Sequence, residues 1–171
     1  MKFDLLTIFP DSLNSYFDSS IIKKARDKKL INIKIHDIRN QTTDKRRTMD
    51  DTPYGGGPGM VLQIAPVYKT IKKIYKRKNK STRVILLSPR GQTLTQNKVK
   101  ELSKYKRLIL IAGHYEAIDA RIDNFVDEKI SLGNFIMTGG ELAAAVVIDS
   151  VARLVPGVVG KAASVEDESF S

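Results

Sequence analysis

The sequence contains no cysteine, and only two of its 171 residues, His36 and His114, are histidines. The absence of cysteine excludes disulfides, thiolate zinc sites and cysteine nucleophiles. Two histidines are too few for a multi-histidine metal site, so we predict no metal site from the residues. No apolar run approaches membrane-spanning length, and the N-terminus MKFDLLTIFP lacks the core and cleavage site of a signal peptide. We therefore expect a cytoplasmic protein with no membrane partner.

Acidic residues are scarce in the first part of the chain. Residues 1–110 hold 25 Lys and Arg against 9 Asp and Glu, whereas residues 111–171 hold 4 against 10. The formal net charge is +10. Such an excess favours a polyanionic partner such as RNA. The alternative is a lysine-rich proteome with no functional meaning at this surface.

Apolar residues make up 42% of the chain, enough for a real core in one domain. The continuous apolar runs 83–87 and 107–112 are typical of strands that are covered on both faces. The segment between them, 94–105, has a helical pattern, and such a unit forms a parallel sheet. We therefore predict an α/β fold, mostly a parallel sheet with helices on both faces.

The remaining elements are predicted from periodicity and turn signals. The segment 31–38 alternates strictly, so it indicates a half-buried strand near a sheet edge, with His36 on its polar, exposed face. The other predicted strands are 3–9 and 126–132, and the predicted helices are 12–29, 65–78, 118–124 and 142–154.

Three predicted loops follow strands and are rich in glycine, serine or proline: 88–91, 113–117 and 132–140. In parallel sheets ligands bind beyond the carboxyl ends of the strands, so these loops predict a small-molecule site. The apolar helix after them carries Asp149 and Arg153, four residues apart. Two interpretations stay open: an ion pair on a core helix, or a functional Arg153 at the edge of a buried element.

A long loop at 39–59, RNQTTDKRRTMDDTPYGGGPG, has no apolar periodicity. A loop of this length in a compact domain is usually functional or disordered. No Gly-Lys-Ser/Thr follows its glycines, so it is not a P-loop. The glycines allow backbone N–H groups to approach a phosphate, although flexibility alone is the commoner reason for such a composition.

Five segments together resemble one family. They are DDTPYGGGPGM at 50–60, LSP at 87–89, GHYEAID at 113–119, TGGEL at 138–142 and IDSVARLVPG at 148–157. The resemblance is to the TrmD family of bacterial tRNA (guanine-N1)-methyltransferases, in the SPOUT class. It implies the SPOUT methyltransferase fold with a deep C-terminal trefoil knot, and a homodimer with its active site between the subunits. The implied reaction is methylation of N1 of the guanosine immediately 3′ of the tRNA anticodon.

The resemblance also implies that S-adenosyl-L-methionine binds in the knot. Strand-end backbone groups suit an adenine edge, and glycines leave room for a bent cofactor. The family's magnesium requirement has no recognisable ligand set in this sequence. The implied cofactor contacts are Leu86, Leu87, Ser88, Pro89, Gly113, Glu116, Leu132, Gly133, Asn134, Phe135, Ile136, Met137, Gly139 and Gly140.

Methyl transfer to N1 of guanine requires a general base, because N1 carries a proton at neutral pH. The resemblance places this base at Glu168, with its neighbour Asp167 as the alternative, although both also fit a frayed acidic tail. It assigns Arg153 to the charge that develops on guanine O6. The implied tRNA contacts are Arg46, Arg47, Asp50, Tyr54, Gly55, Gly56 and Gly57.

Two of the departures from the family pattern bear on function. His114 stands where arginine is more frequent, which removes a permanent cation. Family members continue after Ser-Phe-Ser into a C-terminal tRNA-binding domain. We therefore expect residues 1–160 to form the SPOUT cofactor-binding domain and residues 161–171 to begin an interdomain linker, with the C-terminal domain absent. Such a truncated chain is expected to bind the cofactor but to methylate tRNA poorly. The alternative is a non-catalytic RNA-binding module with a relic cofactor pocket.

Overall fold

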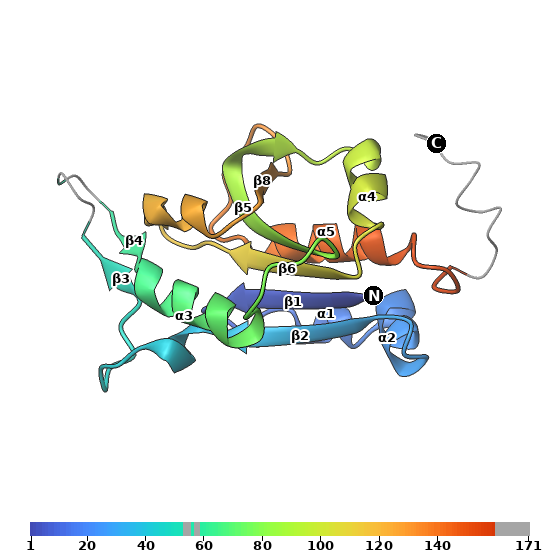
Figure 1. The fold of residues 1–171 in the computed structure, drawn as a ribbon, viewed down its shortest axis with the longest axis horizontal. Helices are drawn as coiled ribbons and strands as arrows, with labels where there is room; N and C mark the ends of the chain where they lie inside the picture. The colour runs from blue at the N-terminus through green and yellow to red at the C-terminus, as the bar shows by residue number, and fades with distance from the viewer. Residues whose placement is uncertain (53–55, 57–58, 160–171) are drawn as a thin grey trace.

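The computed structural model describes residues 1–52, 56 and 59–159. Its centre is a five-stranded sheet of order β2-β1-β6-β5-β8, in which every neighbouring pair is parallel (Figure 1). The predicted parallel sheet is confirmed. The strands begin at one edge of the sheet, called the amino edge, and end at the other, called the carboxyl edge. Their bounds are β1 (Lys2–Thr7), β2 (Asn32–Asp37), β5 (Thr82–Thr93), β6 (Arg107–Ala112) and β8 (Glu128–Ser131).

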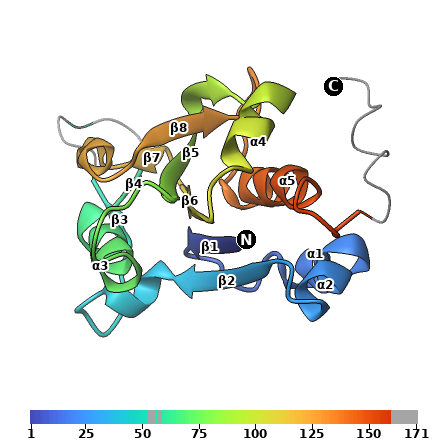
Figure 2. The ribbon, with the colours of Figure 1, turned by 45° about the vertical axis from the view of Figure 1, so that its right-hand side comes forward.

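Helices cover both faces of this sheet, as predicted, because alternate side chains along each strand point to opposite faces. Phe3 and Leu5 belong to one core cluster, whereas Leu6 belongs to the other. Figure 2 shows α1, α2 and α5 on one side of the strands and α3 on the other. The helix bounds are α1 (Asn14–Phe17), α2 (Ser20–Asp27), α3 (Ile64–Ile74), α4 (Gln96–Leu102) and α5 (Glu141–Ala152), with short 3₁₀ helices η1 (Ile38–Gln41) and η2 (Ala120–Asn124).

A second, three-stranded sheet lies in and beside the segments predicted to be loops, and it takes Ile118 from the helix predicted over 118–124. It consists of β3 (Asp50–Asp51), β4 (Val61–Leu62) and β7 (Ala117–Ile118), in the order β3-β4-β7. Strand β4 pairs antiparallel with β3 and parallel with β7. Strands of two residues carry too little periodicity to be recognised in a sequence.

Two predicted boundaries were wrong. The helix expected over 12–29 is divided into α1 and α2, and Ser20 between them has φ of 49°, outside the helical region. Residues 88–91 are not a loop, since β5 runs on to Thr93 after a register shift between Leu87 and Gln92. Gly91 permits this course, because a Cβ there would lie 2.5 Å from the backbone N of Ile130.

The prediction of a surface role for His36 was also wrong. Its ring forms a 2.6 Å hydrogen bond with Asp4, which is only 2% exposed and also accepts a 2.7 Å bond from Arg107. Burial alone would raise the pKa of Asp4, but the hydrogen bonds and charges of His36 and Arg107 outweigh it, so the pKa lies below its ordinary value. His36 therefore helps to keep a buried carboxylate ionised.

A second buried carboxylate, Asp127, lies just before β8. It pairs with Lys78 at 2.6 Å and accepts a 2.9 Å hydrogen bond from the backbone N–H of Val84. Burial tends to raise the pKa of Asp127, but the bonds from Lys78 and Val84 lower it below the ordinary value.

Among the described residues, no helix is long and apolar enough to cross a membrane.

Candidate active site

Two of the predicted ligand loops meet at the carboxyl edge. His114, just beyond β6, forms an isolated antiparallel bridge with Gly139. The backbone N–H of Gly140 donates a 2.8 Å hydrogen bond to the carbonyl of Gly113. The segments 113–117 and 132–140 therefore lie side by side, although they are far apart in the sequence.

The third predicted ligand segment lies beside the same place. The end of β5 pairs with the end of β8, Thr93 with Ser131, and the Leu94 N–H donates 2.8 Å to the Ser131 carbonyl. Ser131 then closes a turn through its hydroxyl, which bonds the backbone of Gly133. All three predicted cofactor segments consequently meet at one edge of the sheet.

The predicted cofactor residues differ in what they can offer a ligand. Leu86 and Leu87 are buried in opposite core clusters, so only their backbone groups are available. Ser88, Gly113, Leu132, Gly133, Met137 and Gly139 are half-buried, whereas Pro89, Glu116, Asn134, Phe135 and Ile136 are exposed.

Gly140 has a structural reason to be glycine. A Cβ at this position would lie 2.9 Å from both Ala112 Cα and Gly113 N. Any other residue would push the start of α5 away from the end of β6. Its packing role is thus visible without any ligand.

A polar cluster joins the ends of β1 and β6 to the start of α5. The hydroxyl of the fully buried Thr7 donates a 2.6 Å hydrogen bond to Glu141, which is 8% exposed. Nδ1 of His114 lies 4.0 Å from the other carboxylate oxygen of Glu141. That nitrogen is buried and has no hydrogen-bond partner in the described part of the chain. Phe9 packs edge-on against the His114 ring at 4.9 Å.

Sequence reasoning missed this cluster. Thr7 and Glu141 are 134 residues apart, and no local pattern reports their contact. The available signal was Glu141 itself, a carboxylate at the start of an otherwise apolar helix. Such a group must be paired where the helix is buried.

The glycine-rich loop is attached to the same edge by the small sheet. Val61 of β4 pairs with Ala117 of β7, and the Glu116 N–H donates 3.1 Å to the Met60 carbonyl. Gly59, with φ of 96°, approaches Glu116 so closely that a Cβ would lie 2.6 Å from Glu116 Cγ. One end of the predicted tRNA loop therefore touches the predicted cofactor segment.

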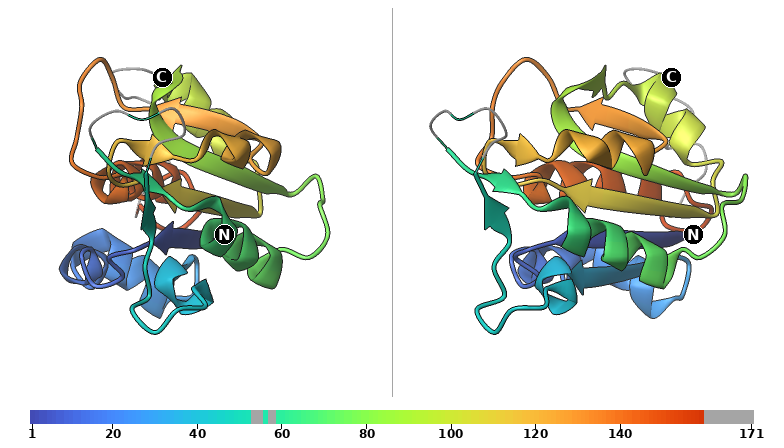
Figure 3. Two further views of the ribbon diagram at one scale, coloured as in Figure 1. Left: turned by 90° about the vertical axis from the view of Figure 1, so that its left-hand side faces the viewer. Right: turned by 60° about the vertical axis from the view of Figure 1, so that its left-hand side comes forward.

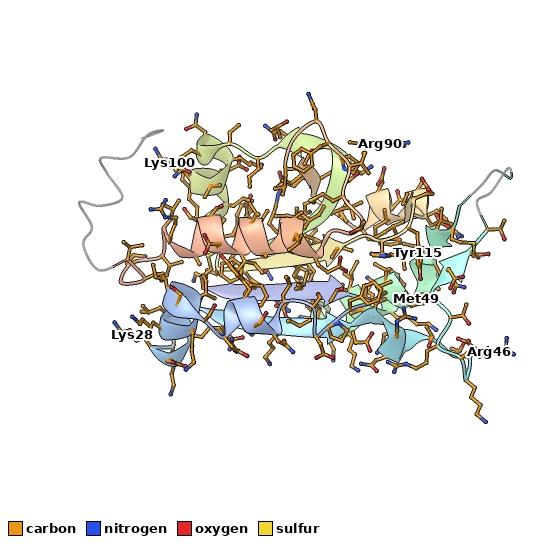
Figure 4. The ribbon with its side chains drawn as sticks, turned by 180° about the vertical axis from the view of Figure 1, so that it is seen from behind. Lys28, Arg46, Met49, Arg90, Lys100 and Tyr115 are labelled. Atoms are coloured by element: carbon orange, nitrogen blue, oxygen red, sulfur yellow. The ribbon has the colours of Figure 1, made fainter. Side chains whose placement is uncertain are left out.

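Within that loop the two predicted arginines differ. Arg46 is exposed and extends outward at one end of the molecule in Figure 4. The Arg47 guanidinium instead bonds Asp37 at 2.7 Å and Asn40 at 2.8 Å, which holds the loop together. Asp50 is half-buried in β3 and Gly56 is exposed, while Tyr54, Gly55 and Gly57 lie outside the described residues.

Of the predicted catalytic residues the structure describes Arg153, and it is not gathered with the cofactor segments. Arg153 directly follows α5, whose other end is at Gly140, and thirteen residues of helix at 1.5 Å each separate them by about 20 Å. Asp149 accepts a 3.0 Å hydrogen bond from Tyr16. Asp167 and Glu168 lie outside the described residues. No group of three or more His, Asp or Glu suited to a metal ion occurs among residues 1–52, 56 and 59–159.

Comparisons with known proteins agree along the whole chain. Residues 1–171 match the family model described as tRNA (Guanine-1)-methyltransferase TrmD. A tRNA (guanine-N(1)-)-methyltransferase of Dehalococcoides mccartyi is 46% identical over 172 residues, which cover 100% of this chain and 69% of the relative. A tRNA (guanine-N(1)-)-methyltransferase of Bacillus cereus is 45% identical, over 100% of this chain and 70% of the relative. The crystal structure of tRNA (m1G37) methyltransferase from Aquifex aeolicus matches with a TM-score of 0.83 and 39% identity, over 94% of this chain and 72% of that one.

Proposed function

The chain belongs to the TrmD family of tRNA (guanine-1)-methyltransferases, and we propose that its carboxyl edge holds S-adenosyl-L-methionine as the methyl donor. Family membership makes the chain a tRNA guanine-N1 methyltransferase, and the crystallised relative is named for position 37 of tRNA. The resemblance seen in the sequence is thereby confirmed.

The observation that carries the cofactor proposal is the meeting of three strand-end segments. The bridge between His114 and Gly139 and the pairing of Thr93 with Ser131 bring 88–93, 113–117 and 132–140 together. Backbone groups there can bond an adenine edge, and the exposed Phe135 and Ile136 offer apolar contact to the rest of the cofactor. The residues therefore fit the group. We assign the family's trefoil knot to these same segments.

The chemistry follows from the protonation of guanine. The bound donor supplies an electrophilic methyl group. Glu168, or Asp167 beside it, would accept the proton of guanine N1 when a bound donor transfers its methyl group to that nitrogen. Arg153 donates hydrogen bonds to O6, where negative charge develops. The loop with Arg46, Asp50 and the glycines contacts the tRNA, with Arg47 acting through the shape of the loop.

We propose that the active site lies between two copies of the chain. Arg153 is about 20 Å from the cofactor segments along its own helix, so a second copy must supply it. Exposed apolar side chains support this pairing, because Leu142 and Val146 lie exposed on α5, with 65% and 43% of their surface accessible. Tyr16, which bonds Asp149 of α5, and Ile21 are exposed as well. Residues 1–160 are the proposed cofactor-binding unit.

Calorimetric titration with S-adenosyl-L-methionine tests the site. Asn134→Trp fills the proposed pocket from an exposed position, and Asn124→Trp adds the same bulk on η2 as a control. We expect the unaltered chain and the control to bind, and Asn134→Trp to lose at least tenfold in affinity. Equal binding by all three would place the cofactor elsewhere. RNA binding by a folded dimer that ignores the cofactor would favour the RNA-binding module.

A further inference from the structure

The cations of this chain are concentrated where the acids are missing. Residues 52–100 contain eleven Lys and Arg and no Asp or Glu. Eight exposed cations lie on segments that meet at the amino edge, opposite the proposed active site, and we name them the amino-edge cations. They are Lys2, Lys28, Lys29, Lys76, Arg77, Lys80, Lys104 and Lys106.

Backbone hydrogen bonds bring these segments into one row. The Lys2 N–H donates 2.9 Å to the Lys106 carbonyl, and the Lys106 N–H donates 2.9 Å to the Ser81 carbonyl. The N-terminal amine of Met1 bonds the Leu30 carbonyl at 2.8 Å, next to Lys28 and Lys29. The row thus follows the starts of β2, β1, β6 and β5.

The figures show the same separation of the two edges. In Figure 3 the green connection between α3 and β5 reaches the same end of the sheet as the N-terminus. Figure 4 places Lys28 and Lys100 at this end and Arg46 and Tyr115 at the other.

The acids at the amino edge already have partners. Asp27 pairs with Lys23 at 3.4 Å and Glu101 with Lys98 at 3.0 Å. Asp127 pairs with Lys78. Asp4 pairs with both Arg107 and His36. None of the amino-edge cations has an ion-pair partner in the part of the chain that the structure describes. Their mutual repulsion makes this edge attractive to an anion.

We propose that the amino edge is a second RNA-binding surface, which contacts the phosphate backbone away from the catalytic edge. Four strand starts about 4.8 Å apart spread the cations over roughly 15 Å, so they reach several phosphates together. A small anion fits less well. It would contact only one or two cations of a row this long.

The surface is suited to contacts with the RNA backbone that do not depend on the base sequence. The aromatic ring that lines the hollow beside Lys80 belongs to Tyr105. The Arg83 guanidinium carbon lies over this ring, 5.9 Å from its centre, and so takes the place of a stacked base. Contacts to phosphates position an RNA but do not specify its sequence. The RNA proposed to lie here is the body of the substrate tRNA, the RNA on which the family acts.

The test compares two triple variants that lose the same charge. The amino-edge variant is Arg77→Gln, Lys80→Gln and Lys106→Gln. The control is Lys34→Gln, Lys69→Gln and Arg121→Gln, all exposed cations away from this edge. The dissociation constants for a tRNA transcript and for an unrelated RNA duplex are measured over a range of salt concentrations. Titration with S-adenosyl-L-methionine shows separately whether each variant keeps the cofactor site.

Each phosphate contact contributes roughly 0.7 to 0.9 to the slope of log K against log salt, so the amino-edge variant should lose about 2 to 3 in slope. The control should keep most of its slope, and both variants should bind the cofactor normally. A loss of slope with tRNA supports the proposal, and an equal loss with the unrelated duplex shows that the contact does not depend on sequence. Equal slopes for the two variants would overturn the proposal, because net charge alone would then explain binding.

Discussion

Replacing Gly140 and Gly113 with alanine separates packing from ligand binding at one place in the fold. A Cβ on Gly140 would lie 2.9 Å from Ala112 Cα, whereas the nearest atom to a Cβ on Gly113 would be 3.5 Å away, an ordinary contact. Gly140 has φ of −84°, which alanine adopts without backbone strain. The cost of Gly140→Ala is therefore overpacking, about 1–3 kcal/mol. It is offset by about 0.4–1 kcal/mol from the reduced entropy of the unfolded chain.

The net loss of about 1–2 kcal/mol should lower the melting temperature of Gly140→Ala by roughly 2–8 °C, since 1 kcal/mol corresponds to about 2–4 °C at this chain length. Gly113→Ala should melt at or slightly above the temperature of the unaltered chain, yet bind S-adenosyl-L-methionine more weakly, because its methyl group stands among the proposed cofactor contacts. Thermal unfolding and calorimetric titration measure the two effects. An unchanged melting temperature for Gly140→Ala would refute the packing argument.

Three further predictions follow from the buried polar groups and from the proposed dimer. Asp4 and Asp127 have pKa values below the ordinary 3.8 in the folded chain. The stability that these carboxylates contribute is therefore present above pH 3.8 and is lost as the pH falls through their lower folded pKa values. Urea unfolding should show a steep loss of stability below about pH 4, and this loss should be shallower in Asp4→Asn. Thr7→Val leaves Glu141 without its 2.6 Å donor and should cost about 1–3 kcal/mol in unfolding free energy. Thr7→Ser should retain most of the stability that Thr7→Val loses. A Thr7→Val chain as stable as the unaltered chain would contradict the role of the hydrogen bond. Arg153→Ala and Asn134→Trp should each abolish the weak tRNA methylation expected of this chain, and a mixture of the two chains should regain part of it, since one site of each mixed dimer is then intact. A mixture that stays inactive would place Arg153 and the cofactor in the same chain.

The sequence predicted the sheet well because its signals are local. The apolar runs 83–87 and 107–112 correspond to β5 and β6, and the alternation over 31–38 corresponds to the edge strand β2. The break between α1 and α2 was not predicted, because apolar residues recur at helical spacing on both sides of Ser19 and Ser20. Gly91 was assigned to a loop because its role depends on the distant backbone of β8.

Contacts between distant segments account for most of what the sequence did not predict at the site. The meeting of Thr7, Glu141 and His114, and the link from Gly59 to Glu116, depend on how the sheet assembles. The placement of His36 beside Asp4 has the same origin, since the partners come from neighbouring strands. The roles of the cofactor and catalytic residues came from the family resemblance, and they stay predictions at single residues.

Hydrogen exchange with and without S-adenosyl-L-methionine tests most directly where the methyl donor binds. We expect the cofactor to protect backbone amides in 88–93, 113–117 and 132–140, while 28–30 and 76–81 at the amino edge exchange as before. Protection confined to other segments, or no change in these three at saturating cofactor, would contradict the proposed site.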